Sequence, residues 1–390
     1  MKIRSMTCFV NVDETLDGDA LHNAGALAGL ARARVPQAGY DLTSTRLAIQ
    51  PLDRLVKTIP ALDLATALDA RLHNLGFDYG ALMFETNSSW AQIPAIISST
   101  ESLFASLRIA SRPEGINLRA IRAAAHVIHE LAHATEDGFG NFRFTAAANC
   151  PPGIPFFPAA YAADGAYAFA FATEAADLAV DAFAGAQNLE DARVRFVQAL
   201  EQNGARLGIL GAELEQKTGL HFAGIDFSPA PYPEQARSLG EALERLTGAR
   251  FGEHGTLFAA SFVTDCLRQA NYPRAGFGGL MIPVMEDWTL ATRSLENLYT
   301  LDSLLLYSTV CGTGLDTVPL AGDTSEEAIS ALLLDLAALA VKLDKPLTAR
   351  LIPVPGVQVG EATRFAFEYF ANARAFEVRA GGLLKVFKKD

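Results

Sequence analysis

The chain has 390 residues, half of them hydrophobic, with a net charge of −12 and a sequence pI of about 5.1. This length can bury a large core, in one α/β domain or in two smaller ones. The acidic balance argues against a nucleic-acid or membrane partner, because cationic patches supply most of the affinity for such surfaces.

Strand-like and helical segments alternate along the first half. Residues 1–12 hold a short apolar run without a cleavage site, which predicts a first strand and not a signal peptide. Residues 117–137 predict an amphipathic helix, with Asn117 as N-cap and Gly138 beyond its end. The remaining expected elements are strands at 45–52, 77–85, 106–111, 142–150 and 166–173 and a helix at 61–76.

The second half continues the alternation. It predicts helices at 174–186, 190–218, 234–247, 255–270, from about 297 and at 324–343, and strands at 221–228, 278–284, 308–315 and 347–354, followed by a final strand. Asp335 interrupts the longest apolar run, so that run is expected to be a covering helix and not a membrane span. No linker rich in Pro, Gly or Ser divides the sequence. We therefore expect one domain over residues 1–390, with nine to eleven strands closing into a barrel.

The four cysteines, Cys8, Cys150, Cys266 and Cys311, are scattered and form no C-x-x-C pair. This spacing is typical of a reducing compartment and offers neither a disulfide framework nor a cysteine–zinc site. We therefore expect a cytoplasmic protein with a small-molecule ligand. The sequence indicates no particular cofactor, and it leaves open whether the chain forms a homo-oligomer.

Residues 129–133 spell H-E-x-x-H, the signature of zinc proteases. At about 100° per residue, the apolar side chains of helix 117–137 fall on one face, and the histidines fall on the other beside Arg119 and Arg122. Two permanent cations would repel Zn²⁺. The motif is therefore interpreted as the solvated side of a helix, without a metal. An adventitious metal site and a peptidase are the alternatives.

A glycine-rich loop at 308–324 contains Cys311, which is expected to follow a strand. Gly312 and Gly314 allow a tight loop whose backbone N–H groups can face a ligand, and Asp316 adds a carboxylate. Cys311 is a candidate nucleophile or hydrogen-atom carrier, and Asp316 a candidate acid–base group. The alternative is a buried structural cysteine beside turn glycines.

The segment 251–257 places His254 before Gly255 and Thr256 at the start of a helix. Backbone donors at a helix N-terminus can bind an anion, and a histidine can act as acid or base near neutral pH. His254 is thus a second candidate catalytic residue, with Gly255 and Thr256 as ligand-binding candidates. A loop histidine that caps the helix is the alternative.

Further candidates stand at strand ends. Asp226 and Ser228 end a strand before a stiff, proline-rich loop and are candidate ligand-binding residues. Glu286 follows the strand predicted at 278–284 and is a candidate catalytic acid–base group. Glu174, at a strand-to-helix junction, is a further ligand-binding candidate. A rigid connection or a solvated turn is the competing interpretation.

Five segments carry a resemblance: "RPEGINLRAI", "GIDFSPAPYP", "FGEHGT", "GGLMIPVMED" and "LYSTVCGTGLDTVPLAGDT". They are similar to the uncharacterised family called domain of unknown function 711, and the resemblance covers most of the chain. It implies an α/β fold, a ten-stranded β/α barrel with a hairpin loop inserted into its centre, as in pyruvate formate-lyase and ribonucleotide reductase. By analogy with those enzymes, the loop with Cys311 is the candidate inserted loop.

The resemblance does not supply a reaction, because one fold hosts many functions. Glycyl-radical enzymes carry an R-V-x-G-aromatic motif near the C-terminus, and residues 379–383 echo it without the valine and the aromatic. The favoured hypothesis is a small-molecule enzyme that uses acid–base or thiol chemistry at the barrel centre on a polar or anionic metabolite. A non-catalytic metabolite sensor is the alternative, and a zinc peptidase or a glycyl-radical enzyme is less favoured.

Overall fold

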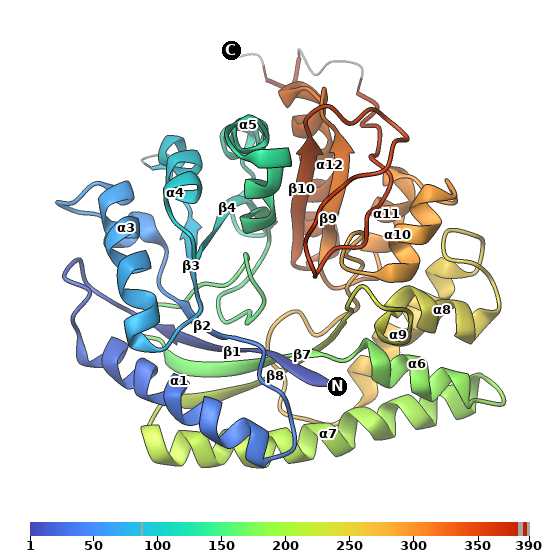
Figure 1. Cartoon of the computed structure of the whole chain (residues 1–390), viewed down its shortest axis with the longest axis horizontal. Coiled ribbons are helices and arrows are strands. Elements are labelled where there is room, and N and C mark those ends of the chain that lie inside the picture. The colour runs from blue at the N-terminus through green and yellow to red at the C-terminus, as the bar shows by residue number, and fades with distance from the viewer. Residues whose placement is uncertain (87–88, 381–384, 388–390) are drawn as a thin grey trace.

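The computed structural model describes residues 1–86, 89–380 and 385–387 (Figure 1). Its strands form one ten-stranded sheet. The strand order is β8 (His221–Ala230), β7 (Tyr167–Glu174), β1 (Lys2–Val10), β2 (Thr45–Ala48), β3 (Tyr79–Phe84), β4 (Leu103–Ser111), β6 (Phe144–Ala148), β10 (Leu347–Val354) and β9 (Gly314–Ala321), with β5 (Gly115–Ile116) paired to β4.

The central strands run in one direction and the edge strands in the other. β1, β2, β3, β4 and β6 are parallel neighbours. β7 pairs antiparallel with β1 and parallel with β8, while β10 pairs antiparallel with β6 and parallel with β9. The predicted mixed α/β sheet is confirmed.

The predicted closed barrel is wrong. Within the described residues, no ladder joins β8 to β9, the two ends of the sheet. The chain between them approaches each edge only through isolated bridges, at Arg274 and at Pro283. Pro283 has no N–H for a ladder, and Gly276 and Gly278 adopt positive φ. The strand predicted at 278–284 is consequently an irregular segment.

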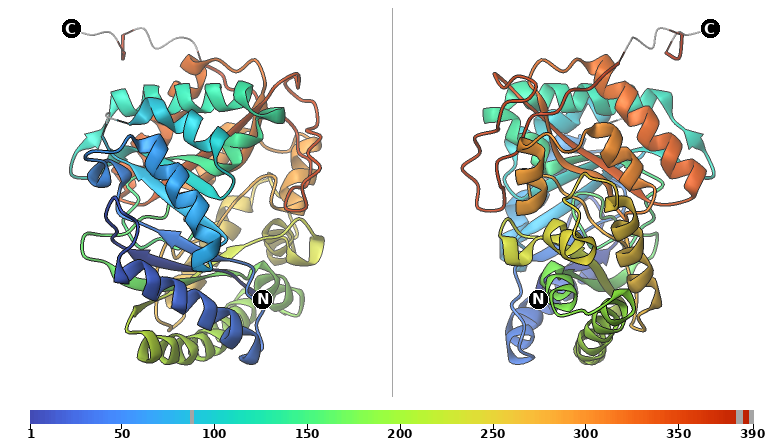
Figure 2. Two further views of the ribbon diagram at one scale, coloured as in Figure 1. Left: turned by 60° about the vertical axis from the view of Figure 1, so that its left-hand side comes forward. Right: turned by 90° about the vertical axis from the view of Figure 1, so that its right-hand side faces the viewer.

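Helices surround the sheet, most of them on its outer face (Figure 1). They are α1 (Asp19–Gln37), α2 (Leu52–Leu55), α3 (Ala61–Leu72), α4 (Ile93–Ser99), α5 (Leu118–Ala134), α6 (Ala176–Ala184), α7 (Leu189–Thr218), α8 (Leu239–Thr247), α9 (Thr256–Gln269), α10 (Trp288–Leu295), α11 (Leu301–Ser308) and α12 (Glu326–Leu343), with short 3-10 turns at His73–Leu75, Trp90–Gln92, Glu136–Arg143 and Gln235–Arg237. α1 and α7 lie beside β1 and β8, while α5 and α12 pack on each other (Figure 2). None of the described helices is long and apolar enough to cross a membrane.

The helices with the clearest sequence signals are confirmed. At the start of α5, the Asn117 side chain accepts a hydrogen bond from Ala120 N. At the start of α7, Asn188 accepts one from Asp191 N. Each cap satisfies a backbone donor that the first helical turn leaves free, which fixes where the helix begins.

Other elements differ from the prediction. α1 has no predicted counterpart, because Gly25 and Gly29 weaken its helical signal, and in the fold it packs on β1 and α7. The strand predicted at 308–315 is the end of α11, a turn and the first residues of β9. No strand follows β10 in the described part of the chain, and Gly381, Gly382 and Leu383 of the echoed radical motif lie outside it. The single domain over 1–390 stays a prediction.

A segment between β6 and β7 covers part of the inner face of the sheet. Residues 150–162 pack on inward-facing side chains such as Phe9 and Phe104. The Pro155 carbonyl accepts a hydrogen bond from a buried threonine of β1 at 2.8 Å. Cys311 instead packs in the main hydrophobic core. Cys311 itself is thus not part of the segment on the inner face, and insertion of its loop into the centre of the fold is not confirmed.

Candidate functional site

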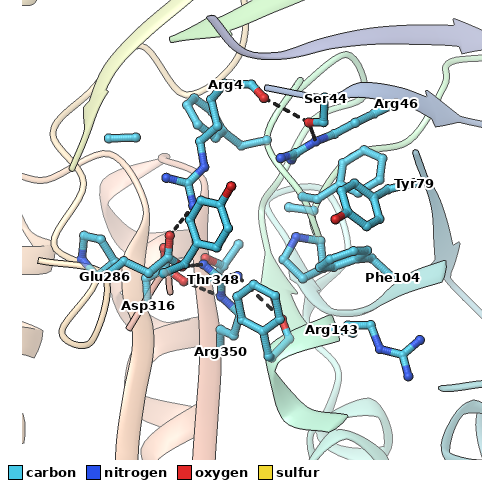
Figure 3. A pocket seen from close by; sticks show the side chains of 18 of the residues that line it. Arg4, Ser44, Arg46, Tyr79, Phe104, Arg143, Glu286, Asp316, Thr348 and Arg350 are labelled. Carbon is cyan, nitrogen blue, oxygen red and sulfur yellow. Dashed lines mark hydrogen bonds and ion pairs between the residues drawn. The ribbon is translucent and has the colours of Figure 1, made fainter. Parts of the chain in front are cut away.

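A cavity of about 520 Å³ lies on the inner face of the sheet, within the size range of small-molecule sites (Figure 3). Its wall joins strands that are far apart in the sequence, with Arg4 on β1, Arg46 on β2, Tyr79 on β3, Phe104 on β4 and Arg350 on β10. Other polar and aromatic residues of the wall are Thr43, Ser44, Asp78, Thr100, Glu101, Phe139, Phe142, Arg143, Phe156, Phe157, Phe277, Glu286, Thr313, Asp316, Thr348, Phe367 and Tyr369.

Two of the arginines are held by carboxylates. Glu286 forms ion pairs with both Arg4 and Arg350, and its Oε1 lies 2.7 Å from Arg350 Nη2. Arg350 Nε also lies 2.7 Å from Asp316 Oδ1. Figure 3 shows the four side chains converging from β1, β9, β10 and the segment before α10. We call Arg4, Glu286, Asp316 and Arg350 the ion-pair cluster.

Burial and pairing together set the charges of this cluster. Glu286 and Arg350 are 3% and 6% exposed. Burial alone would raise the pKa of Glu286, but Arg4 and Arg350 outweigh it and hold that pKa below its ordinary value. Burial likewise acts to lower the pKa of the two arginines, and their carboxylate partners raise it. Glu286 is therefore an ionised carboxylate at neutral pH and a weak base.

Arg46 has no such partner. Its Nε donates a hydrogen bond to Ser44 Oγ at 2.9 Å, and none of the described carboxylates forms an ion pair with its guanidinium. The guanidinium lies over the rings of Phe157 and Tyr79, 5.0 and 5.9 Å from their centroids. Burial and the positive charge of Arg4 lower the pKa of Arg46 to about 9. The two Nη groups therefore form a donor fork without a carboxylate.

The remaining charged residues of the wall are engaged elsewhere. Arg143 points away from the cavity centre and donates to three backbone carbonyls (Figure 3). Asp78 pairs with Arg32, outside the cavity, and Glu101 is exposed. With Arg46 and the ion-pair cluster, the cavity centre thus holds three guanidinium groups against two carboxylates.

Aromatic rings form much of the remaining wall. Phe104 contacts Tyr79, Phe142 and Phe157 edge-to-face, with ring centroids 5.5 to 5.8 Å apart. Phe142 contacts Phe367 of the C-terminal segment at 5.3 Å. The cavity therefore combines one excess positive charge with apolar, planar walls.

The comparisons with known proteins identify a family. The family model described as "Uncharacterised ACR (DUF711)" matches residues 1–371. The chain belongs to the DUF711 family. Relatives named UPF0210 protein include one from Pyrobaculum islandicum, 31% identical over 83% of this chain and 76% of its own, one from Methanopyrus kandleri, 30% identical over 87% and 80%, and one from Oenococcus oeni, 27% identical over 93% and 88%. The resemblance predicted from the sequence is confirmed, and these names state no activity.

In this DUF711 protein, two of the predicted catalytic residues meet in the cavity. Glu286 and Asp316 both line it, and they share Arg350 as an ion-pair partner. Their positions, on the segment before α10 and on β9, follow from the isolated bridge that joins Pro283 to Asp316. A role for either carboxylate in catalysis stays a prediction.

Cys311 and its neighbouring glycines do not line the cavity, although Thr313 and Asp316 of the same loop do. Cys311 is 2% exposed and follows α11, and its Sγ accepts a hydrogen bond from Gly314 N at 3.3 Å. Lys345 Nζ donates to the Cys311 carbonyl. Gly312 packs against Gly279 so closely that a Cβ on either would lie 2.7 Å from the other's Cα. These glycines thus serve backbone packing, and a catalytic role of the thiol stays a prediction.

The His254 loop also lies outside the cavity wall. His254 is exposed and makes no hydrogen bond to the described residues. Gly255 is the N-cap of α9 with a φ of 113°. Thr256 Oγ1 donates to the Glu253 carbonyl at 2.9 Å and accepts from Gly252 N at 3.0 Å. The Thr256 hydroxyl is therefore engaged within its own loop, and an acid–base role for His254 stays a prediction.

The other ligand-binding candidates have protein partners. Asp226 accepts hydrogen bonds from Ser228 Oγ at 2.6 Å and from the backbone N–H groups of Phe277 and Gly278. Burial raises the pKa of Asp226. Glu174 pairs with an arginine that precedes α8. Asp226 and Ser228 thus attach the irregular segment to β8.

The H-E-x-x-H motif lies on the solvent side of α5, as its helical phase predicts. His126 Nδ1 is 2.9 Å from Glu326 Oε1 of α12, and His133 Nδ1 donates to the His129 carbonyl at 2.8 Å. The apolar face of α5 is buried. Over the described ranges, no group of three or more His, Cys, Asp or Glu side chains is arranged to hold a metal ion.

The three cavity arginines were not among the predicted site residues. Arg46 lies in the strand predicted at 45–52, which ends at Ala48, and Arg350 lies in the correctly predicted strand 347–354. A charged residue within an otherwise buried strand is the signal that points to them, because its charge must find a partner or a wet cavity. Arg4 carries the same signal within β1.

Proposed function

We propose that the protein is a small-molecule enzyme that binds a small anionic metabolite in this cavity and acts on it by acid–base chemistry. The guanidinium of Arg46 is the observation that supports the proposal most. A planar guanidinium with two Nη groups free of carboxylates matches a carboxylate or phosphate in a bidentate arrangement. An anion there would neutralise the excess positive charge.

The other side chains have roles that follow from their surroundings. Glu286 holds Arg4 and Arg350 in place, and as an ionised carboxylate it can stabilise a developing positive charge. Burial raises the pKa of Tyr369, whose hydroxyl makes no hydrogen bond to the described residues. That hydroxyl stays protonated at neutral pH and is a candidate proton donor. The aromatic wall lowers the local dielectric, which strengthens these interactions.

A non-catalytic metabolite sensor is the second candidate. One observation favours it: both carboxylates of the ion-pair cluster are engaged with arginines, and the lowered pKa of Glu286 makes that residue a weak base. A sensor needs only the Arg46 fork and the aromatic wall.

Several other features belong to the proposal. A cytoplasmic location is supported by four free, buried cysteines. The likeness to the glycyl-radical barrel is supported by the number of strands and by the family resemblance alone. Thiol chemistry at Cys311 with His254, and a homo-oligomeric state, are kept as predictions.

A screen of an unlabelled metabolite pool tests the proposal. Thermal shift detects binding, because a ligand of the native state raises Tm by mass action, and mass spectrometry detects consumption. We expect anions that raise the Tm of the wild type and of Arg206→Gln but not of Arg46→Gln. Arg206 is a matched control, since it is an exposed arginine that lies over a tyrosine ring outside the cavity. Binding without consumption favours the sensor, and the absence of any Arg46-dependent anion overturns the proposal.

A further inference from the structure

We infer that the anion held by Arg46 is a monocarboxylate with an aromatic body. This inference rests on the proposed function and narrows its substrate class. Two properties of the cavity carry it: the size of its excess charge and the arrangement of the rings around Arg46.

The charge count favours a single negative charge on the ligand. Glu286 and Asp316 already compensate Arg4 and Arg350, so only Arg46 remains without a carboxylate. A monocarboxylate balances that charge. A dicarboxylate or a phosphate monoester brings a second charge into a cavity that contains two ionised carboxylates, where like charges repel.

The rings around Arg46 favour an aromatic body. The Arg46 guanidinium lies over the rings of Tyr79 and Phe157, and its two Nη groups are left for a carboxylate. Phe104 contacts both of these rings and connects them to the other aromatic side chains of the cavity wall. A ligand ring beside Phe104 can extend this edge-to-face series, whereas a saturated ring can only fill the space.

The opposite side of the cavity has the same design. Arg350 lies over the Phe142 ring at 5.1 Å, and Arg4 lies over Tyr369 at 5.9 Å. All three guanidinium groups thus have a face on an aromatic ring. The N–H groups of Arg4 and Arg350 bind carboxylates of the protein. The ligand would supply the carboxylate for Arg46.

Calorimetric titration of the full chain with matched probes tests the inference. The probes are 3-phenylpropionate, its saturated counterpart 3-cyclohexylpropionate, its dicarboxylate counterpart benzylmalonate, and the uncharged 3-phenylpropanamide. We expect 3-phenylpropionate to bind at least about threefold more tightly than 3-cyclohexylpropionate. It should bind at least about tenfold more tightly than benzylmalonate and about thirtyfold more tightly than the amide.

Three variants assign the binding to the cavity. Arg46→Gln should weaken 3-phenylpropionate by about thirtyfold or more, while Arg206→Gln leaves its affinity unchanged. Tyr79→Leu should reduce the preference for the aromatic probe over the saturated one. Because Tyr79 is 37% exposed, this change is compatible with a folded protein, which the unfolding curve verifies.

The possible results separate the inference from the proposed function. Equal affinity for benzylmalonate overturns the single charge, and equal affinity for 3-cyclohexylpropionate overturns the aromatic body. In both cases Arg46-dependent binding of an anion leaves the proposed function standing. If neither these probes nor succinate nor inorganic phosphate bind in an Arg46-dependent manner, both the inference and the proposed function fail.

Discussion

Arg350 and Arg46 face one cavity, but their surroundings differ. Arg350 is clamped between Glu286 and Asp316, which ties β10 to β9 and to the segment before α10. Arg46 has a serine hydroxyl and two ring faces. The comparison teaches that the same side chain can stabilise the fold on one wall and remain available for a ligand on the other, depending on whether a carboxylate shares its burial.

Removing the charge of Glu286, from the cavity wall that contains Arg350, should have the largest effect on the free energy of unfolding. Glu286→Gln leaves Arg4 without its carboxylate and Arg350 with only Asp316, and breaking a buried ion pair costs about 3 kcal/mol or more. Urea unfolding measures the loss. Glu130→Gln on the exposed side of α5 is the control, with an expected change within about 0.5 kcal/mol. A loss below about 1 kcal/mol at Glu286 would show that this wall is not a structural clamp.

The stabilisation by the ion pairs of Glu286 should also decrease in acid. The pKa of Glu286 is lowered on folding, so its stabilisation is complete above the unfolded value of about 4.3 and is lost as the pH falls through the folded pKa. The free energies of unfolding of wild type and Glu286→Gln should therefore converge below about pH 4, because a protonated carboxyl resembles an amide. Urea titrations between neutral pH and pH 3 measure this difference. A difference that stays constant with pH contradicts the assignment of an ionised Glu286.

On the wall that contains Arg46, we expect removal of a charge to change the free energy of unfolding in the opposite direction. Arg46→Gln removes a cation that sits near Arg4 without compensation, so without ligand the free energy of unfolding should rise by up to about 1 kcal/mol. Arg206→Gln should leave it unchanged. If Arg46→Gln lowers the free energy of unfolding instead, Arg46 stabilises the fold as Arg350 does.

The difference between the two walls could not be predicted from the sequence. Strands and helices were largely predictable because their signals are local, such as the Asn117 and Asn188 caps. The cavity is not local: β1, β2 and β10 meet only through the strand order of the sheet. Predicting that Glu286 pairs with Arg350 while Arg46 stays unpaired requires knowing which strands are neighbours.

The misjudged loops have a physical reason as well. Glycine pairs such as those around Cys311 allow a backbone to approach a ligand, but they equally allow two backbones to approach each other. At Gly312 and Gly279, two backbone segments approach each other. Glu286 and Asp316 do line the cavity, because the Pro283–Asp316 bridge brings the irregular segment before α10 against the start of β9.

Thr313 is an intermediate case in the cavity wall. It is 2% exposed, and its hydroxyl has no hydrogen-bond partner among the described residues. A buried hydroxyl without a partner costs about 1 kcal/mol, so Thr313→Val should raise the free energy of unfolding by up to that amount. Thr348→Val is the contrast, because the Thr348 hydroxyl donates to the Thr313 carbonyl at 2.8 Å and its loss should be destabilising. Equal effects of the two changes would contradict this difference.

His254 lies on neither wall and should give the smallest effect on stability and binding. Its side chain is exposed, so His254→Ala should change the free energy of unfolding by less than about 0.5 kcal/mol and leave the affinity of the cavity for its anion unchanged. Turnover is the readout that decides its predicted role, because loss of a general acid or base lowers the rate by about a hundredfold or more. A hundredfold slower variant with normal binding would mean that the His254 loop reaches the cavity during the reaction. Turnover at the wild-type rate would mean that the chemistry is carried by residues that line the cavity, such as Glu286, Asp316 and Tyr369.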